Sequence, residues 1–129
     1  MITKIKPDKQ KSDSLIKMGR VTLERLDNTD MEKYPTNTLL DYYDVIHKLI
    51  EAITLMEGIK IKGEGSHQEL IDYVAELEKI DEHMRQFLQQ MRDYRNRISY
   101  EGFMINKNYI SLNKKIIRKI IERLFSQLN

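Results

Sequence analysis

Apolar residues recur every three or four positions along most of this chain, and this pattern limits its fold more than any other feature. The clearest run follows the polar segment 35–38 and consists of Leu39, Leu40, Tyr43, Ile46, Leu49, Ile50, Ile53 and Leu55. An α-helix has about 3.6 residues per turn, so side chains at this spacing form one apolar face. Thr36, Asn37 and Thr38 are residue types that cap the start of a helix. We therefore predict a helix here that ends at Gly58.

Four other segments repeat the pattern. The predicted helices cover about residues 12–26, 70–77, 80–102 and 111–128, and a capping box of Ser66 and Glu69 precedes the second of these. The inward residues of the last helix are predicted to be Leu112, Ile116, Ile117, Ile120, Ile121, Leu124, Phe125 and Leu128. The glycine-rich segment 59–65 is expected to be a loop, and no alternating pattern predicts a strand. Each helix has one apolar face to bury, which predicts an all-α fold, a five-helix up-and-down bundle.

The length of 129 residues suits one domain with a single core. Residues 1–11 contain several lysines and a proline but no helical periodicity, so we expect a flexible leader there. Residues 12–129 are expected to form the helical domain.

Charge and composition exclude several classes of function. The 22 Lys and Arg nearly balance the 20 Asp and Glu, which argues against a large phosphate-binding surface but leaves room for a local basic patch. Cysteine is absent, and no apolar run has the length of a signal peptide or a membrane span. His47, His67 and His83 are dispersed over three predicted helices. We therefore expect a cytoplasmic protein without a membrane contact, a metal site or a cofactor.

The most informative segment ends the fourth predicted helix and reads Arg95-Asn96-Arg97-Ile98-Ser99-Tyr100-Glu101-Gly102. It resembles the signature segment of HEPN domains, which are small helical bundles of prokaryotic toxin–antitoxin and RNA-processing systems. In active members an Arg, a polar residue, a short spacer and a His form this segment, and the Arg–His pair cleaves RNA without metal. Tyr100 stands in the place of that His. On a regular helix Arg95 and Tyr100 point about 140° apart, so within one copy they meet only if the helix bends.

The resemblance implies a homodimer in which two copies of the segment share one cleft. Arg95, Asn96 and Tyr100 would then face this cleft as the candidate catalytic residues, and Arg92 and Arg97 would contact substrate. An arginine clamps phosphate with two hydrogen bonds, whereas a tyrosine with a pKa near ~10 is a poor base at neutral pH. This set therefore suits binding better than fast hydrolysis. The implied function is to bind RNA or a nucleotide, as a degenerate or weak metal-independent ribonuclease of a toxin–antitoxin or RNA-defence system.

Two alternatives stay open. The chain would be a catalytically silent module that pairs with a nucleotidyltransferase-type partner, with Tyr100 or Tyr109 as the modified residue. In the other alternative, Arg95, Asn96 and Tyr100 only close the end of an unrelated helical adaptor. A neighbouring nucleotidyltransferase gene favours the first of these, and a monomer at micromolar concentration weakens both readings based on HEPN.

Overall fold

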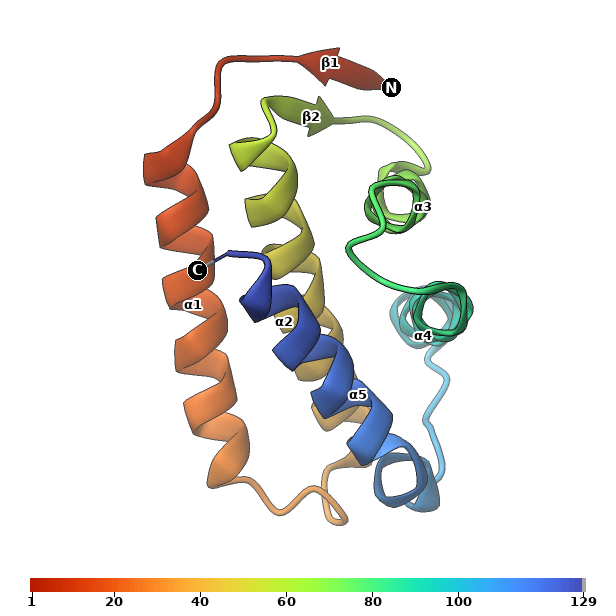
Figure 1. Cartoon of the computed structure of the whole chain (residues 1–129). Helices are drawn as coiled ribbons and strands as arrows, with labels where there is room; N and C mark the ends of the chain where they lie inside the picture. Colours follow the sequence, from red (N-terminus) through yellow and green to blue (C-terminus); the bar gives the residue numbers. More distant parts are fainter. Residues whose placement is uncertain (129) are drawn as a thin grey trace.

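The computed structural model describes residues 1–128. Its elements in chain order are β1 (Ile2–Lys4), α1 (Lys9–Asp27), α2 (Pro35–Met56), β2 (Ile59–Ile61), α3 (Ser66–Glu76), α4 (Glu82–Glu101) and α5 (Asn108–Ser126). The predicted all-α helical bundle is confirmed, with five helices and one small sheet (Figure 1). None of the helices between residues 1 and 128 is long and apolar enough to cross a membrane.

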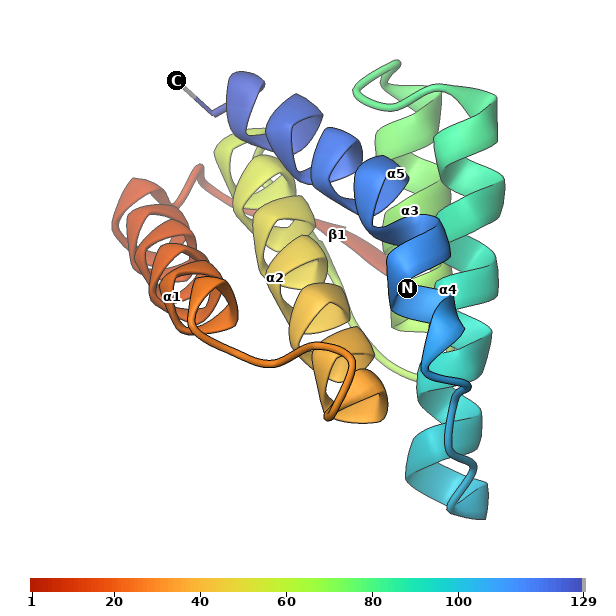
Figure 2. The ribbon, with the colours of Figure 1, turned by 90° about the horizontal axis from the view of Figure 1, so that it is seen from below.

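The long helix α2 forms the centre of the core. Its fully buried side chains include Leu39, Tyr42, Val45, Leu49 and Ala52. Helix α1 runs beside it in the opposite direction (Figure 1), and α5 packs along α2 (Figure 2). Ser12 in α1 is buried and donates a hydrogen bond of 2.9 Å to the carbonyl oxygen of Ala52. The α1–α2 pair is thus held by a buried polar contact as well as by apolar packing.

Helices α3 and α4 form a second pair that crosses the first group. Figure 1 shows them end on, whereas α1, α2 and α5 are seen from the side. Asp81 caps α4 by accepting a hydrogen bond of 2.8 Å from the amide of Met84. Gly102 ends α4 in the left-handed conformation at φ 69°, as the sequence predicts. The candidate segment of residues 95–102 therefore lies at the free end of a regular helix.

The predicted flexible leader over residues 1–11 is wrong for this structure. β1 pairs with β2 in antiparallel register, with Ile2 opposite Ile61. The amide of Ile5 donates a 2.8 Å hydrogen bond to Gly58, and α1 already begins at Lys9. The loop expected over residues 59–61 is likewise a strand. Three residues are too short for their alternation to be read in a sequence, and the partner strand lies far away along the chain.

Two further local predictions are wrong. Ser66 is the first residue of α3 and makes no capping hydrogen bond, because Gly65 holds the cap position at φ 77°. The side chain of Glu69 instead accepts a 3.0 Å hydrogen bond from the amino terminus at Met1. Leu112 is 79% exposed rather than inward. It lies about 140° around α5 from the buried Ile117, outside the face that packs on the core.

Candidate functional site

The predicted segment at the end of α4 does not bring its own residues together within one copy of the chain. Arg95 is half-buried, and its Nη1 donates a 3.1 Å hydrogen bond to Oδ1 of the neighbouring Asn96. Tyr100 is 82% exposed. Since α4 remains helical to Glu101, the angle expected between Arg95 and Tyr100 is retained.

The two flanking arginines have different surroundings. Arg92 is half-buried, and its Nε donates a 2.8 Å hydrogen bond to Oε1 of Gln89. Arg97 is exposed; its Nε lies 3.5 Å from Oε2 of Glu101, and its guanidinium lies over the ring of Phe103 at 4.1 Å. Arg97 therefore contacts Glu101 and Phe103 at the end of α4, whereas Arg92 is hydrogen-bonded to a neutral side chain.

Arg92 and Arg95 differ from most other arginines of the chain because they lack a carboxylate partner. The arginines with one are Arg25 with Asp41, Arg85 with Asp72 and Glu82, Arg97 with Glu101, and Arg118 with Asp27. Within residues 1–128, neither Arg92 nor Arg95 forms an ion pair. Burial removes part of the water that solvates a guanidinium. Where no carboxylate of the chain takes its place, hydrogen bonds to a bound anion can compensate for the lost solvation, so such an arginine favours anion binding.

Tyr43 and His67 lie within the electrostatic reach of these two arginines. Burial raises the pKa of Tyr43 to about 12, against the positive charges of Arg95 and Arg92. The phenol therefore stays protonated at neutral pH. Its oxygen lies 3.0 Å from Nδ1 of His67, so we assign the phenol as the donor and Nδ1 as the acceptor.

His67 is neutral at physiological pH. Burial, together with the electrostatic effect of His47, Arg95 and Arg92, lowers its pKa to about 4, against the opposing charge of Glu51. With Nδ1 accepting from Tyr43, the proton of the neutral ring is on Nε2. His67 therefore offers an N–H donor.

His47 stacks directly on His67, although the histidines are dispersed along the sequence. The ring centroids are 3.8 Å apart and the planes differ by 10°. Nε2 of His47 lies 2.8 Å from Oε1 of Glu51, and this hydrogen bond keeps the pKa of Glu51 below its usual value. Tyr43, His47 and Glu51 are four residues apart along α2, which is a signal that the sequence did contain. The position of His67 next to His47 depends instead on the path of residues 57–65, which connect α2 to α3.

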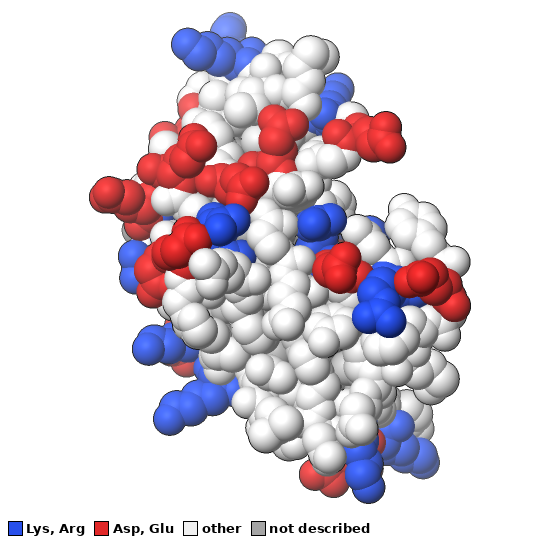
Figure 3. Space-filling view, turned by 90° about the vertical axis from the view of Figure 1, so that its right-hand side faces the viewer, with Lys and Arg blue, Asp and Glu red and all other residues white. Residues whose placement is uncertain are grey.

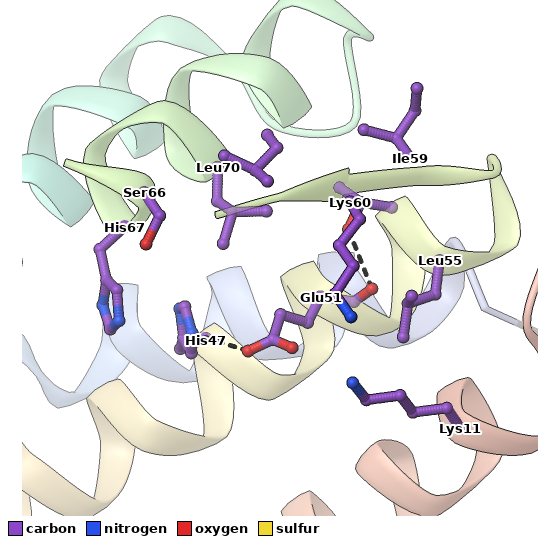
Figure 4. A pocket seen from close by; sticks show the side chains of 11 residues that line it. Lys11, His47, Glu51, Leu55, Ile59, Lys60, Ser66, His67 and Leu70 are labelled. Atoms are coloured by element: carbon purple, nitrogen blue, oxygen red, sulfur yellow. Dashed lines mark hydrogen bonds and ion pairs between the residues drawn. The ribbon is translucent and has the colours of Figure 1, made fainter. Parts of the chain in front are cut away.

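The histidine pair forms one wall of a pocket of about 230 Å³ between α1, α2, β2 and α3. The pocket is lined by Lys11, His47, Glu51, Thr54, Leu55, Ile59, Lys60, Ile61, Ser66, His67 and Leu70. Figure 4 shows Lys11 entering from α1 and Lys60 from β2, with their amino ends on the same side of Glu51. No group of three or more His, Asp or Glu side chains in the described part of the chain is arranged to hold a metal ion. Its two lysines give the pocket a positive charge, which favours an anion.

The outer surface around α3 and α4 has no single basic band. Figure 3 shows this side of the molecule, with acidic side chains gathered in its upper part and a broad uncharged area below them. The lysines and arginines in this view are scattered. The basic groups that could meet an anion are therefore those of the local site, in agreement with a net charge of only +2.

Comparison with known proteins adds no relative to this picture. No protein-family model, no curated protein and no solved structure matches the chain. A proposed function therefore depends on the geometry of the site and on the resemblance of residues 95–102.

Proposed function

We propose that this chain is a HEPN-like protein that binds RNA or a nucleotide through its phosphates. The observation that carries the proposal is the pair Arg92 and Arg95, half-buried on one side of α4 and without a carboxylate partner in residues 1–128. A guanidinium matches a phosphate with two parallel hydrogen bonds. The neutral His67, within the electrostatic reach of both arginines, adds a donor without adding a charge. Asn96 orients Arg95 through their hydrogen bond.

We further propose that a second copy of the chain completes the cleft. The buried residues of α4 are Met84, Leu88 and Met91, whereas none of residues 92–101 is fully buried. Figure 2 shows this end of α4 extending beyond the other helices. Tyr100 and Met104 are 82% and 76% exposed there. A second copy would cover this apolar surface, and a twofold axis would bring Tyr100 of one copy towards Arg95 of the other.

The proposed chemistry is mainly binding. Tyr100 in this cleft would donate a hydrogen bond to a phosphate or stack on a base, and it would be a poor base for the 2′-hydroxyl. Cleavage would therefore be slow and independent of metal. The resemblance to HEPN domains alone suggests a toxin–antitoxin or RNA-defence system in the cytoplasm.

A second candidate function is pairing with a nucleotidyltransferase-type partner that modifies a tyrosine. The exposure of Tyr100 favours it, because its phenol is open to a second protein. Tyr109, the other candidate, has a buried hydroxyl. A nucleotide adduct found by mass spectrometry on Tyr100 would support this candidate.

The proposed function is tested by fluorescence anisotropy with a labelled single-stranded RNA at low salt. Arg95→Gln and Arg92→Gln are each expected to weaken binding about tenfold, since each removes a charge-assisted contact. Arg20→Gln is the matched control: it removes the same charge from α1, where Arg20 lies over the ring of Phe125. Equal binding by the wild type and both α4 variants would contradict the proposal. Any RNA cleavage by the wild type should also be lost in Arg95→Gln.

A further inference from the structure

We propose that the pocket between α1, α2, β2 and α3 binds a terminal phosphate, the monoester group at the end of an RNA or on a mononucleotide. This inference rests on the proposed function, since it names the part of the RNA that a second site, next to the α4 arginines, would recognise. It concerns residues outside the α4 segment, namely Lys11, Lys60, Ser66 and His67.

The pocket is positively charged. Lys11 and Lys60 line it, and Glu51 is its one acidic residue. The positive charges of Lys62 and Lys11 lower the pKa of Lys60, so both ammonium groups lie close to that of Lys60, although Lys62 does not line the pocket. The two lining ammonium groups and one carboxylate leave one positive charge unbalanced, and Lys62 adds a further positive charge nearby. A phosphate monoester carries about −1.5 to −2 at neutral pH, whereas an internal phosphodiester carries about −1.

The pocket also offers hydrogen-bond donors. Nδ1 of His67 accepts from Tyr43, which leaves Nε2–H as a donor. Ser66 adds a hydroxyl, and Figure 4 shows both residues at the start of α3 beside the pocket. No side chain caps this helix, and the amide of Ser66 donates to the carbonyl oxygen of Gly63 at 3.2 Å. Within residues 1–128, this leaves the amides of His67 and Gln68 as free donors at the positive end of the helix dipole. A phosphate would thus meet neutral donors on one side and ammonium groups on the other.

The shape of the site also favours a terminal phosphate. Four elements form the walls of a pocket of about 230 Å³, which suits one phosphate with part of its sugar. An internal phosphodiester would need the RNA chain to enter and leave through these walls. His67 lines the pocket and also feels the charges of Arg95 and Arg92. The next phosphate of an RNA held by its end would therefore lie on the side of these arginines.

The test uses one labelled RNA sequence in three forms: with a 5′-phosphate, with a 3′-phosphate, and with hydroxyls at both ends. The wild type is expected to bind one phosphorylated form about tenfold more tightly than the hydroxyl form. The double variant Lys11→Gln/Lys60→Gln should lose this preference and bind the hydroxyl form like the wild type. Lys17→Gln/Lys119→Gln is the control, because it removes the same two charges from exposed positions that do not line the pocket.

The outcomes separate this inference from the proposed function. Equal binding of all three RNAs by the wild type, or a preference that survives Lys11→Gln/Lys60→Gln, would overturn the pocket assignment while RNA binding through Arg95 stands. If no RNA binds, adenosine monophosphate and inorganic phosphate are titrated instead, with the ring protons of His47 and His67 followed by NMR. Shifts in the wild type that the double variant lacks would support the pocket alone. Unshifted ring protons would overturn it.

Discussion

At the scale of single residues, the site depends on an imidazole that stays uncharged. His67 has a pKa of about 4 because it is partly buried beside His47, Arg95 and Arg92. Tyr43 fixes its tautomer through a hydrogen bond of 3.0 Å. The N–H group of His67 can donate a hydrogen bond to an anion. Because the ring is neutral, it adds no third positive charge near Arg92 and Arg95.

The neutral state of His67 predicts how stability depends on pH. In the unfolded chain a histidine titrates near ~6.5, so between about pH 6.5 and pH 4 the unfolded state binds more protons than the folded state. Stability therefore rises with pH across this range and is lost as the pH falls. Because the ring is partly exposed and solvent screens it, the loss should be on the order of 1 kcal/mol.

Urea unfolding at pH 7 and pH 4.5 measures this effect. His67→Gln should remove the extra loss at low pH, whereas His83→Gln, at an exposed position on α4, should keep it. An NMR titration that places the pKa of His67 near its ordinary value would refute the prediction. The same titration in Arg95→Gln should show a higher pKa for His67, because a neighbouring positive charge is gone.

At the scale of elements, residues 1–8 lie over the C-terminal end of α2, and we call this segment the strap. β1 pairs with β2, and Gly58 lies where the segment passes α2. Gly58 has φ 72°, and a Cβ there would lie 2.7 Å from the carbonyl oxygen of Ile5. β2 in turn carries Lys60 into the pocket. The strap thus helps to position one wall of the candidate phosphate site.

Gly58→Ala is predicted to cost about 2–3 kcal/mol of stability, from backbone strain together with the displaced strap. Gly63→Ala is the matched control, because Gly63 has φ 94° but no atom within 4 Å of its added Cβ. It should cost only about 1 kcal/mol. Chemical unfolding of both variants measures the difference. Equal losses would mean that the strap is not held against α2.

At the scale of the whole molecule, a single copy of the chain leaves apolar side chains exposed at the end of α4. Tyr100 and Met104 are mostly exposed, and the arginines of the candidate site lie on the same half of α4. Pairing through this end would cover the apolar side chains and place two phosphate sites in one cleft. The proposed dimer and the proposed RNA binding are therefore linked predictions.

The chain is predicted to sediment as a dimer at micromolar concentration, and Tyr100→Glu/Met104→Glu is predicted to convert it to a monomer. Each substitution would put a charge into an apolar interface. Val21→Glu is the control, since Val21 is 60% exposed on α1, away from α4. Analytical ultracentrifugation of the three proteins checks this. A monomeric wild type would remove the dimer from the proposal.

The candidate site could be predicted only in part. The half-buried position of Arg95 follows from its place beside the apolar face of α4, which is a local property. The row of Tyr43, His47 and Glu51 on α2 is also visible in the spacing. His67 was missed as their partner because it follows the turn formed by Gly63 and Gly65, both with positive φ, whose path no periodicity reports.

The amino-acid sequence alone determined the number of helices, most of the residues they bury and the C-terminal ends of α2 and α4, because these depend on neighbours within one or two turns. It did not give the start of α2, because Thr36, Asn37 and Thr38 lie inside the helix that begins at Pro35 and do not cap it. The tertiary structure decided which polar groups meet. His47, His67, Lys60 and Arg95 come from α2, α3, β2 and α4, so their proximity depends on how these elements cross and on the path of the chain between them. The pairing of β1 with β2 also depends on the tertiary structure. A strand of three residues has too short a pattern to show in the sequence which strand it pairs with.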